Sequence, residues 1–241
     1  MNNKDLLLIG NYRSDGRRNN EIRDIKITTH LISEASGSAE VSQGETTVIA
    51  WINGPREGRN KNMENRGQVK CIFSLAPFAS LTRKKDYKRD LKMREFSKSI
   101  KDIFEQVIIL ENYQKCEIVL NVLVTQTDGS YKAAVINAVT LALIDAGIQI
   151  KDTVVSVTLG LFDNEVSLFD VNLQEEKEKI PIFNVAYLPV ARKFTYIELV
   201  NSNTPYENIE NLMREAEKAC GLVYTEIKRF LKDEFVGNKQ Q

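Results

Sequence analysis

Apolar and polar residues alternate along the first third of the chain in a pattern typical of half-buried β-strands. The segment Asp24–Ile32 (DIKITTHLI) has a period of two, and a second alternating segment, 39–54 (AEVSQGETTVIAWING), is interrupted at Gly44. A glycine inside a strand pattern indicates a turn or a bulge. We therefore predict strands here that end at Pro55 and, after a charged loop, a short strand within Gly67–Phe78 (GQVKCIFSLAPF).

Three later segments have the spacing of helices. An amphipathic helix is predicted where apolar residues recur at intervals of three and four: Phe96, Ile100, Ile103, Phe104, Val107 and Ile108. The nearly all-apolar segment from Ala133 to Ala146 predicts a helix buried on most sides, with Gly147 as its left-handed stop. A third helix should begin at Thr204–Glu207 (TPYE), which combines an N-cap threonine, a first-turn proline and a capping-box glutamate. Its expected inward face comprises Ile209, Leu212, Met213, Ala216, Leu222, Val223, Ile227 and Phe230.

Strand patterns separate these helices and fix the fold class. The remaining strands are expected in three segments: 116–124, 152–171 (a pair joined around Asp163–Asn164) and 180–200 (a further pair). The acidic segment Asn172–Lys179 (NLQEEKEK) is expected to be a loop. The order strands, helix, strand, helix, strands, helix, without a Pro/Gly-rich linker, predicts one α/β (α+β) domain over 1–241 with a mixed β-sheet and packed helices. A polar tail should begin at about residue 236.

Composition narrows the function classes. With 33 basic and 33 acidic side chains the formal net charge is +0, so nucleic-acid binding would need a local patch. The cysteines Cys71, Cys116 and Cys220 lie far apart, which favours a reducing compartment over a disulfide framework or a zinc site. No segment approaches the ~18–20 apolar residues of a membrane span, so we expect a soluble intracellular protein without membrane contact. The one histidine, His30, lies in an alternating segment and is expected to be an ordinary sheet residue.

The segment Gln126–Ala138 (QTDGSYKAAVINA) carries the most suggestive local chemistry. It follows an apolar strand and opens the buried helix, so unpaired backbone N–H groups should point outward at its start. Such a helix start favours anions, and Lys132 lies in the expected first turn. We predict a phosphate cradle formed by Gly129, Ser130, Tyr131 and Lys132.

Two charged segments add candidate chemistry, each with an ordinary alternative. Arg83–Arg94 (RKKDYKRDLKMR) carries seven basic residues against two acidic ones, and is either a solvated face or a contact for a phosphate backbone. Its candidate RNA-binding residues are Arg83, Lys84, Lys85, Lys88, Arg89, Lys92 and Arg94. Asp170 and Glu176 either hold a divalent cation or supply a general acid, or belong to a charged surface turn.

Three longer segments carry a resemblance to a known family: YRSDGRRNNEIR (12–23), GSAEVSQGETTVIAWINGPRE (37–57) and QTDGSYKAAVINAVTLALIDAGI (126–148). Through them the chain resembles, from Tyr12 to about Phe235, the RNase PH family, and within it the RNase PH-type core subunits of the eukaryotic RNA exosome ring. The resemblance implies the RNase PH fold, an S5 domain 2-like α/β fold with two βαβα-type halves. It also implies a hexameric ring around an RNA channel, topped by S1/KH cap proteins.

Active members of this family carry out phosphorolysis, in which inorganic phosphate attacks the 3′-terminal phosphodiester of RNA and releases a nucleoside diphosphate. Their phosphate turn resembles Q-A-D-G-G-T-R, so Ser130, Tyr131 and Lys132 replace a glycine, a threonine and the phosphate-binding arginine here. A lysine keeps the charge but lacks the planar bidentate fork of arginine. Tyr131 also places a bulky ring where a small hydroxyl side chain would let the anion approach.

The carboxylates and the basic pair of the family are also altered. Asp170 matches the family's first aspartate, and Glu176 stands where active members have a second one. A further aspartate of archaeal relatives has no counterpart before Pro181. An arginine pair of the archaeal subunits aligns approximately with Leu91 and Lys92, so one of these two cations is absent.

These substitutions predict a ring subunit that supports 3′→5′ RNA processing and degradation, including that of ribosomal RNA, as scaffold and channel wall. It would be catalytically inactive or weak, would need no cofactor, and would rely on an associated hydrolytic nuclease. The alternative is an active phosphate-dependent exoribonuclease with Mg²⁺, because Lys132, Asp170 and Glu176 keep charges of the right sign. A homohexameric transfer-RNA 3′-trimming enzyme is disfavoured, since it should keep the phosphate-binding arginine. The expected location is the nucleus, including the nucleolus, and the cytoplasm.

Overall fold

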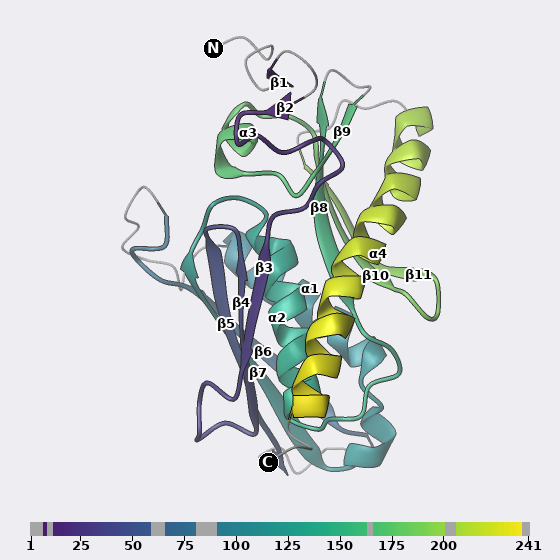
Figure 1. The fold of residues 1–241 in the computed structure, drawn as a ribbon. Helices are drawn as coiled ribbons and strands as arrows, with labels where there is room; N and C mark the ends of the chain where they lie inside the picture. Colours follow the sequence, from purple (N-terminus) through teal and green to yellow (C-terminus); the bar gives the residue numbers. More distant parts are fainter. Residues whose placement is uncertain are drawn as a thin grey trace.

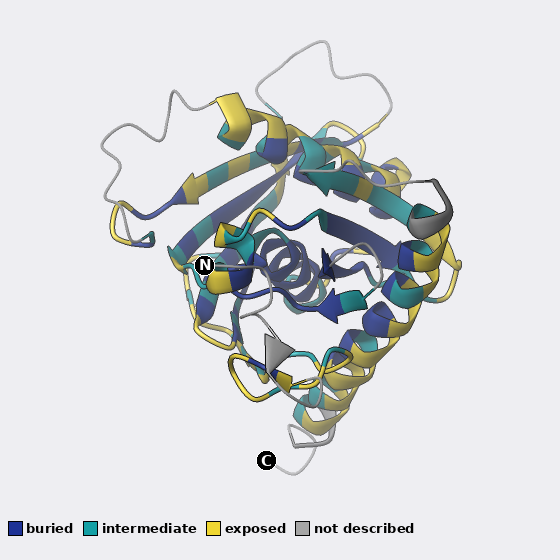
Figure 2. Cartoon of the chain, turned by 90° about the horizontal axis from the view of Figure 1, so that it is seen from above, coloured by how far each residue is buried: buried dark blue, intermediate teal, exposed yellow. Residues whose placement is uncertain are grey.

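Two β-sheets from successive parts of the chain enclose a buried central helix in the computed structural model (Figure 1). The structure describes residues 7–8, 12–58, 66–80, 91–162, 166–200 and 206–237. Viewed from above, helix α2 (Tyr131–Asp145) lies between the sheets, and eleven consecutive residues from Ala133 to Leu143 are buried (Figure 2). The prediction of a helix buried on most sides is confirmed, and Gly147 adopts the expected left-handed conformation with φ 66°.

The first sheet is mixed, as predicted. Its strand order is β3 (Ile25–Thr29), β4 (Gly37–Gln43), β5 (Thr46–Glu57), β7 (Cys116–Gln126), β6 (Gln68–Leu75). Only the β6–β7 pair is parallel, and the chain reverses between β4 and β5 at Gly44, with φ 57°. The prediction that the strand ends at Pro55 is wrong, because β5 continues to Glu57. A register shift between Asn53 and Arg56 carries the strand past the proline, which has no N–H to donate.

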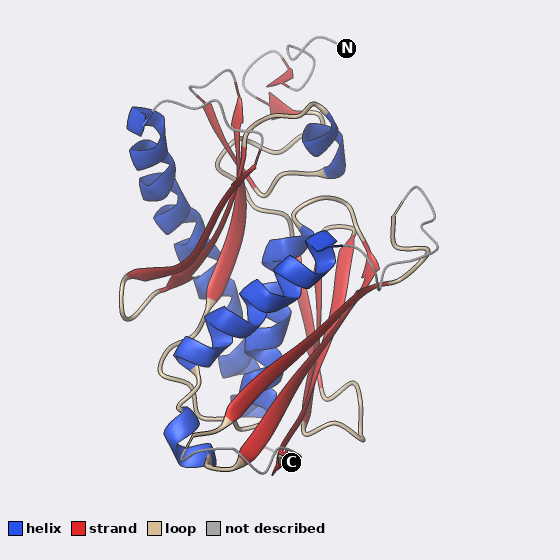
Figure 3. Ribbon diagram, turned by 180° about the vertical axis from the view of Figure 1, so that it is seen from behind, coloured by secondary structure: helices blue, strands red, loops and turns tan. Residues whose placement is uncertain are grey.

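The second sheet is antiparallel throughout. Its order is β11 (Lys193–Val200), β10 (Ile182–Leu188), β8 (Val155–Phe162), β9 (Val166–Phe169). Every residue of β8 is buried, because the strand packs against α2 and also against α4 (Tyr206–Gly237). From behind, α4 lies along the outer side of this sheet and α1 (Leu91–Val107) beside the first sheet (Figure 3). A short pair, β1 (Leu7–Leu8) with β2 (Tyr12–Arg13), and a 3₁₀ turn, η3 (Leu110–Tyr113), complete these elements.

The helix faces follow the predicted patterns with one exception. The buried side of α1 consists of predicted residues: Phe96, Ile100, Ile103, Phe104 and Val107. In α4, Leu212, Ala216, Val223 and Ile227 are buried, but Leu222 is 45% exposed, so its predicted inward position is wrong. Thr204 and Pro205 of the predicted helix start lie outside the described residues. Among the described residues, none of the helices combines the length and the apolar character that crossing a bilayer requires.

The segment Asn172–Lys179, expected to be a loop, contains a short helix, α3 (Leu173–Lys177). The Asn172 side chain accepts the backbone N–H of Glu175, and the Glu175 carboxylate accepts the backbone N–H of Asn172. This reciprocal capping box starts the helix, and the Asn-x-x-Glu spacing in the sequence is its signature. The loop prediction is therefore wrong. It was based on the charged composition of the segment and did not use the capping signal.

Candidate functional site

The strand, turn and helix predicted for the phosphate cradle are present: they are β7, residues 127–130 and α2. Gly129 and Ser130 both adopt the left-handed conformation, with φ 80° and 52°. That conformation is unfavourable for serine, and its hydroxyl is fixed by donating to the carbonyl of Val171 at 2.7 Å. A Cβ atom on Gly129 would lie 2.5 Å from the carbonyl oxygen of Val171. The close packing of the turn on this segment therefore accounts for the glycine without any bound anion.

The amide at the start of the cradle already has an anionic partner within the chain. The backbone N–H of Ser130 donates to the Glu176 carboxylate at 2.9 Å. Burial raises the pKa of Glu176 above its ordinary value, and this hydrogen bond partly opposes the increase. Glu176, predicted as a catalytic carboxylate, thus occupies a helix N-terminus where an external anion would bind.

The predicted cation of the cradle is also engaged. Lys132 Nζ lies 2.6 Å from each carboxylate oxygen of Glu198 on β11. It also lies 5.5 Å from the centre of the Phe96 ring, against which the Tyr131 ring packs edge to face at 6.2 Å. Burial alone would raise the pKa of Glu198, but Lys132, together with Tyr196 and Asn184, holds it below its ordinary value. Glu198 was not predicted as a site residue, since nothing in its strand pattern marks it.

The cavity beside the turn is small and carries no excess of positive charge. Its volume is about 130 Å³, and Ser130, Lys132 and Glu176 contribute to its lining. The two glutamates that contact the cradle, Glu176 and Glu198, against one lysine give a net side-chain charge of −1 when all are ionised. A phosphate dianion would therefore meet repulsion here rather than the attraction that such cradles normally provide.

Asp170 lies in the interior and is paired with Arg23. Its side chain is fully buried and accepts hydrogen bonds from the Arg23 backbone N–H, Nε and Nη2 at 3.0, 2.8 and 2.7 Å. Burial by itself would raise the pKa of Asp170, but the hydrogen bonds and charge of Arg23 lower it below the ordinary value. The guanidinium of Arg23 also donates to the carbonyls of Asp128 and Gly129, at 2.7 and 3.3 Å, and so links Asp170 to the turn.

The two predicted catalytic carboxylates do not fit a shared magnesium ion. Asp170 accepts three N–H groups of Arg23, and Glu176 accepts the amide of Ser130. A divalent cation needs oxygen atoms that are free to coordinate it, and both Asp170 oxygens and Glu176 Oε1 already accept these hydrogen bonds. Within the described part of the chain, no group of three or more His, Cys, Asp or Glu side chains is arranged to hold a metal ion.

A second buried ion pair lies beside the first and was missed by sequence reasoning. Arg13 and Glu175 are both fully buried, and Arg13 Nε donates to the Glu175 carboxylate at 2.7 Å. Arg13 Nη2 donates to the carbonyl of Asp170 at 3.1 Å, and Arg17 to the same carbonyl at 3.2 Å. The N-terminal arginines therefore fasten the segment that carries Asp170 and α3. The arginines of YRSDGRRNNEIR (12–23) were the only signal in the sequence, and they do not name their partners.

The other predicted residues lie away from the cradle or outside the description. Of the candidate RNA-binding residues, Arg83, Lys84, Lys85, Lys88 and Arg89 lie outside the described residues. Lys92 and Arg94 are exposed in the first turn of α1. His30 lies one residue after β3 with φ 55°, so the prediction of a sheet residue is wrong; its Nδ1 atom lies 3.0 Å from Asp145.

Comparisons with known proteins agree with this fold. The profile of the RNase_PH family, described as "3' exoribonuclease family, domain 1", matches residues 21–149. The chain is 33% identical over 232 residues to the exosome complex component Rrp41 of Pyrobaculum neutrophilum, covering 95% of this chain and 94% of the relative. It is 33% identical over 224 residues to the exosome complex component RRP41 of Mus musculus, covering 92% and 91%.

Two solved structures share the fold. The crystal structure of rice (Oryza sativa) Rrp46 superimposes with a TM-score of 0.80 at 20% identity, covering 91% of this chain and 100% of that chain. The Archaeoglobus fulgidus exosome with RNA bound to the active site gives a TM-score of 0.78 at 19% identity, covering 90% and 93%. The predicted RNase PH fold is confirmed.

Proposed function

This chain belongs to the RNase PH family of 3′ exoribonucleases, and from that premise we propose that it is a ring subunit of an RNA exosome that has lost phosphorolysis. The whole-length similarity to Rrp41 components of exosome complexes supports the assignment to the ring. In that role the chain supports 3′→5′ RNA processing and degradation as scaffold and as part of the channel wall.

One observation carries the loss of phosphorolysis: the chain's own carboxylates occupy two groups of the cradle, the Ser130 amide and the Lys132 ammonium. Glu176 accepts the Ser130 amide, and Glu198 binds Lys132. Phosphate binding would have to displace both contacts and accept a site whose net charge is −1 when ionised. Protonation of Glu176, which its raised pKa favours, brings that charge only to zero.

The position of Asp170 supports the same proposal. A general acid or a metal ligand needs an oxygen that reaches the reacting groups. The carboxylate of Asp170 is fully buried and bonded to Arg23, an arrangement that stabilises the turn rather than exposing an acid to substrate. Asp170 acts here as a structural anion.

The partners follow from the family. We propose other RNase PH-type subunits as ring neighbours, single-stranded RNA in the channel, S1/KH cap proteins on the ring and an associated hydrolytic nuclease. A nuclear, nucleolar and cytoplasmic location is proposed on the same ground. Lys92 and Arg94, exposed at the start of α1, are the described part of the proposed RNA surface.

The test is an RNA degradation assay with the purified full chain. A 5′-labelled single-stranded RNA is incubated with Mg²⁺, with and without inorganic phosphate, and nucleoside diphosphates are measured. We expect no phosphate-dependent shortening, by the chain alone or in a reconstituted ring, where a neighbouring subunit can add arginines. Phosphate-dependent release of nucleoside diphosphates in either state would establish the active phosphorolytic alternative.

A second measurement tests whether Glu198 prevents phosphate from binding to the cradle. Calorimetric titration with inorganic phosphate should detect no binding to the wild-type chain and measurable binding to Glu198→Gln, which frees Lys132. Glu210→Gln, at an exposed glutamate on α4, is the matched control for the charge change. Equal phosphate binding by the wild type and Glu198→Gln would show that Glu198 does not block the cradle.

A further inference from the structure

Strand β6 is an outer strand of the first sheet. It pairs with β7 on one side, and no described strand pairs with its other side. Ile72, near its middle, is 58% exposed. An open strand edge presents backbone N–H and C=O groups that another chain can pair with, and natural proteins usually cover or disrupt such edges.

The direction of the backbone groups along β6 follows from two contacts. The Ala76 N–H donates to Val124 at the end of β7, whereas the Cys71 carbonyl accepts from the Ser97 hydroxyl of α1 at 3.0 Å. Backbone groups alternate sides along a strand, so those of Cys71 and Phe73 point away from β7. Ser97 satisfies one of these acceptors, and the groups of Phe73 remain for an added strand.

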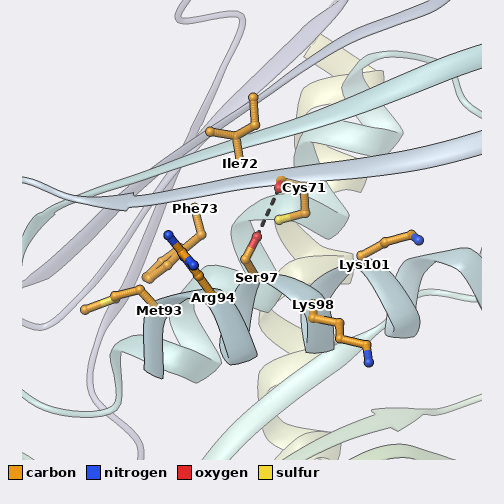
Figure 4. Close-up of a pocket in the computed structure, with 8 residues that line it drawn as sticks. All are labelled: Cys71, Ile72, Phe73, Met93, Arg94, Ser97, Lys98 and Lys101. Carbon is orange, nitrogen blue, oxygen red and sulfur yellow. Dashed lines mark hydrogen bonds between the residues drawn. The ribbon is translucent and has the colours of Figure 1, made fainter. Parts of the chain in front are cut away.

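A groove runs between this edge and α1, with a volume of about 400 Å³ (Figure 4). Arg94, Lys98 and Lys101 line its helical side at intervals of four and three residues, which place them on one face of the helix. Lys98 forms no ion pair with the described residues, and Lys101 has only a long, partly exposed contact of 3.8 Å with Glu105. None of the described residues that line the groove is acidic, and Lys98 and Lys101 give this part of it an excess of positive charge.

The groove favours a peptide over a nucleic acid. Single-stranded nucleic acids bind through base stacking on exposed aromatic rings in addition to cations. Phe73, the only aromatic side chain among the described residues that line the groove, packs edge to face on Phe96 at 5.1 Å and is not free to stack a base. The open backbone groups of β6, in contrast, match the hydrogen-bonding pattern of an extended polypeptide.

We propose that the β6–α1 groove is a docking site for an extended acidic segment of a partner protein, which adds to the edge of β6 as a strand. Side chains of an added strand alternate between two faces. One set would meet Lys98 and Lys101, and the other would lie on the side to which Ile72 points in Figure 4. The partner segment therefore has acidic residues at every second position with apolar residues between them. This proposal is independent of the cradle and of the loss of phosphorolysis.

The first test uses a fluorescent peptide of alternating Glu and Val residues, as long as β6 with its 8 residues, and measures its anisotropy on titration with the full chain. We expect saturable binding. A peptide of the same composition with Glu and Val in two separate blocks should bind at least about tenfold more weakly, because its charges no longer face one side. A peptide N-methylated at alternate amides on the pairing edge should lose binding, because it keeps the side chains but not the donors.

The second test changes the groove. Lys98→Glu/Lys101→Glu should weaken binding by about tenfold or more, whereas Lys228→Glu/Lys232→Glu on α4, with the same charge change, should alter it less than about twofold. Circular dichroism spectra of both variants establish that they fold. Equal binding of the alternating and block peptides, or equal effects of the two variants, would overturn the proposal. Binding of a single-stranded RNA that Lys98→Glu/Lys101→Glu abolishes, without peptide binding, would overturn it in favour of an RNA groove.

Discussion

The substitution Asp170→Asn tests the structural role of this carboxylate. In the folded chain, Asp170 is fully buried and Arg23 is 7% exposed, so neither group retains much contact with water. The substitution removes the negative charge but leaves the guanidinium in place. Asparagine keeps one oxygen acceptor and introduces an NH₂ group that cannot accept from Arg23.

The expected cost follows from the burial of the pair. Removing one partner of a buried ion pair costs about 3–5 kcal/mol, because the remaining charge is left uncompensated. Because asparagine keeps one oxygen acceptor, we expect the free energy of unfolding to fall by about 3 kcal/mol, at the lower end of that range. For a chain of this size, that loss lowers the melting temperature by roughly 10 °C.

Urea unfolding, followed by circular dichroism, measures the effect. Asp24→Asn is the matched control, because Asp24 is exposed and near Arg23 in sequence, and it should change the free energy of unfolding by less than about 0.5 kcal/mol. A cycle with Arg23→Met should give a coupling of at least about 2 kcal/mol between the two residues. A change of less than about 1 kcal/mol for Asp170→Asn would refute the reasoning that this pair holds the turn in place.

Three further expectations rest on the same region. Arg13→Met and Glu175→Gln should each destabilise the fold by about 3–5 kcal/mol, whereas the double replacement Arg13→Met/Glu175→Gln should cost less than their sum in urea unfolding. Gly129→Ala should cost more than Gly147→Ala in thermal unfolding, because both have positive φ but only the Cβ at Gly129 would meet backbone, at 2.5 Å. The folded pKa of Asp170 lies below its ordinary value of 3.8, so the contribution of its pair is fully present above that pH. The stability difference between wild type and Asp170→Asn should therefore narrow as the pH falls below 3.8, measured by urea unfolding across that range.

Periodicity predicted the elements of this fold because it reports local burial. The alternation in Asp24–Ile32 and the apolar spacing after Phe96 each show which side of one element faces the core. That information is contained within the element and does not depend on distant residues. Where a local signal was available but overlooked, the prediction failed. The Asn-x-x-Glu spacing at Asn172 starts a helix in a segment whose charge had indicated a loop.

The sequence also determined the shape of the candidate site. A strand, a small-residue turn and a helix start are contiguous in the chain, so Gly129, Ser130 and Lys132 had to lie together. Residue types and their local order thus predicted a phosphate cradle with a cation, Lys132. The departures of Ser130, Tyr131 and Lys132 from the working pattern were implied only by the family resemblance.

Only the tertiary structure decided which charged side chains form ion pairs with one another. Arg13 and Glu175 are 162 residues apart, Arg23 and Asp170 147, and Lys132 and Glu198 66. A sequence gives the sign of each charge but not its distance to the others, and electrostatic energy depends on that distance and on burial. Lys132 therefore looked like a cation available for phosphate until the fold placed Glu198 of β11 against it.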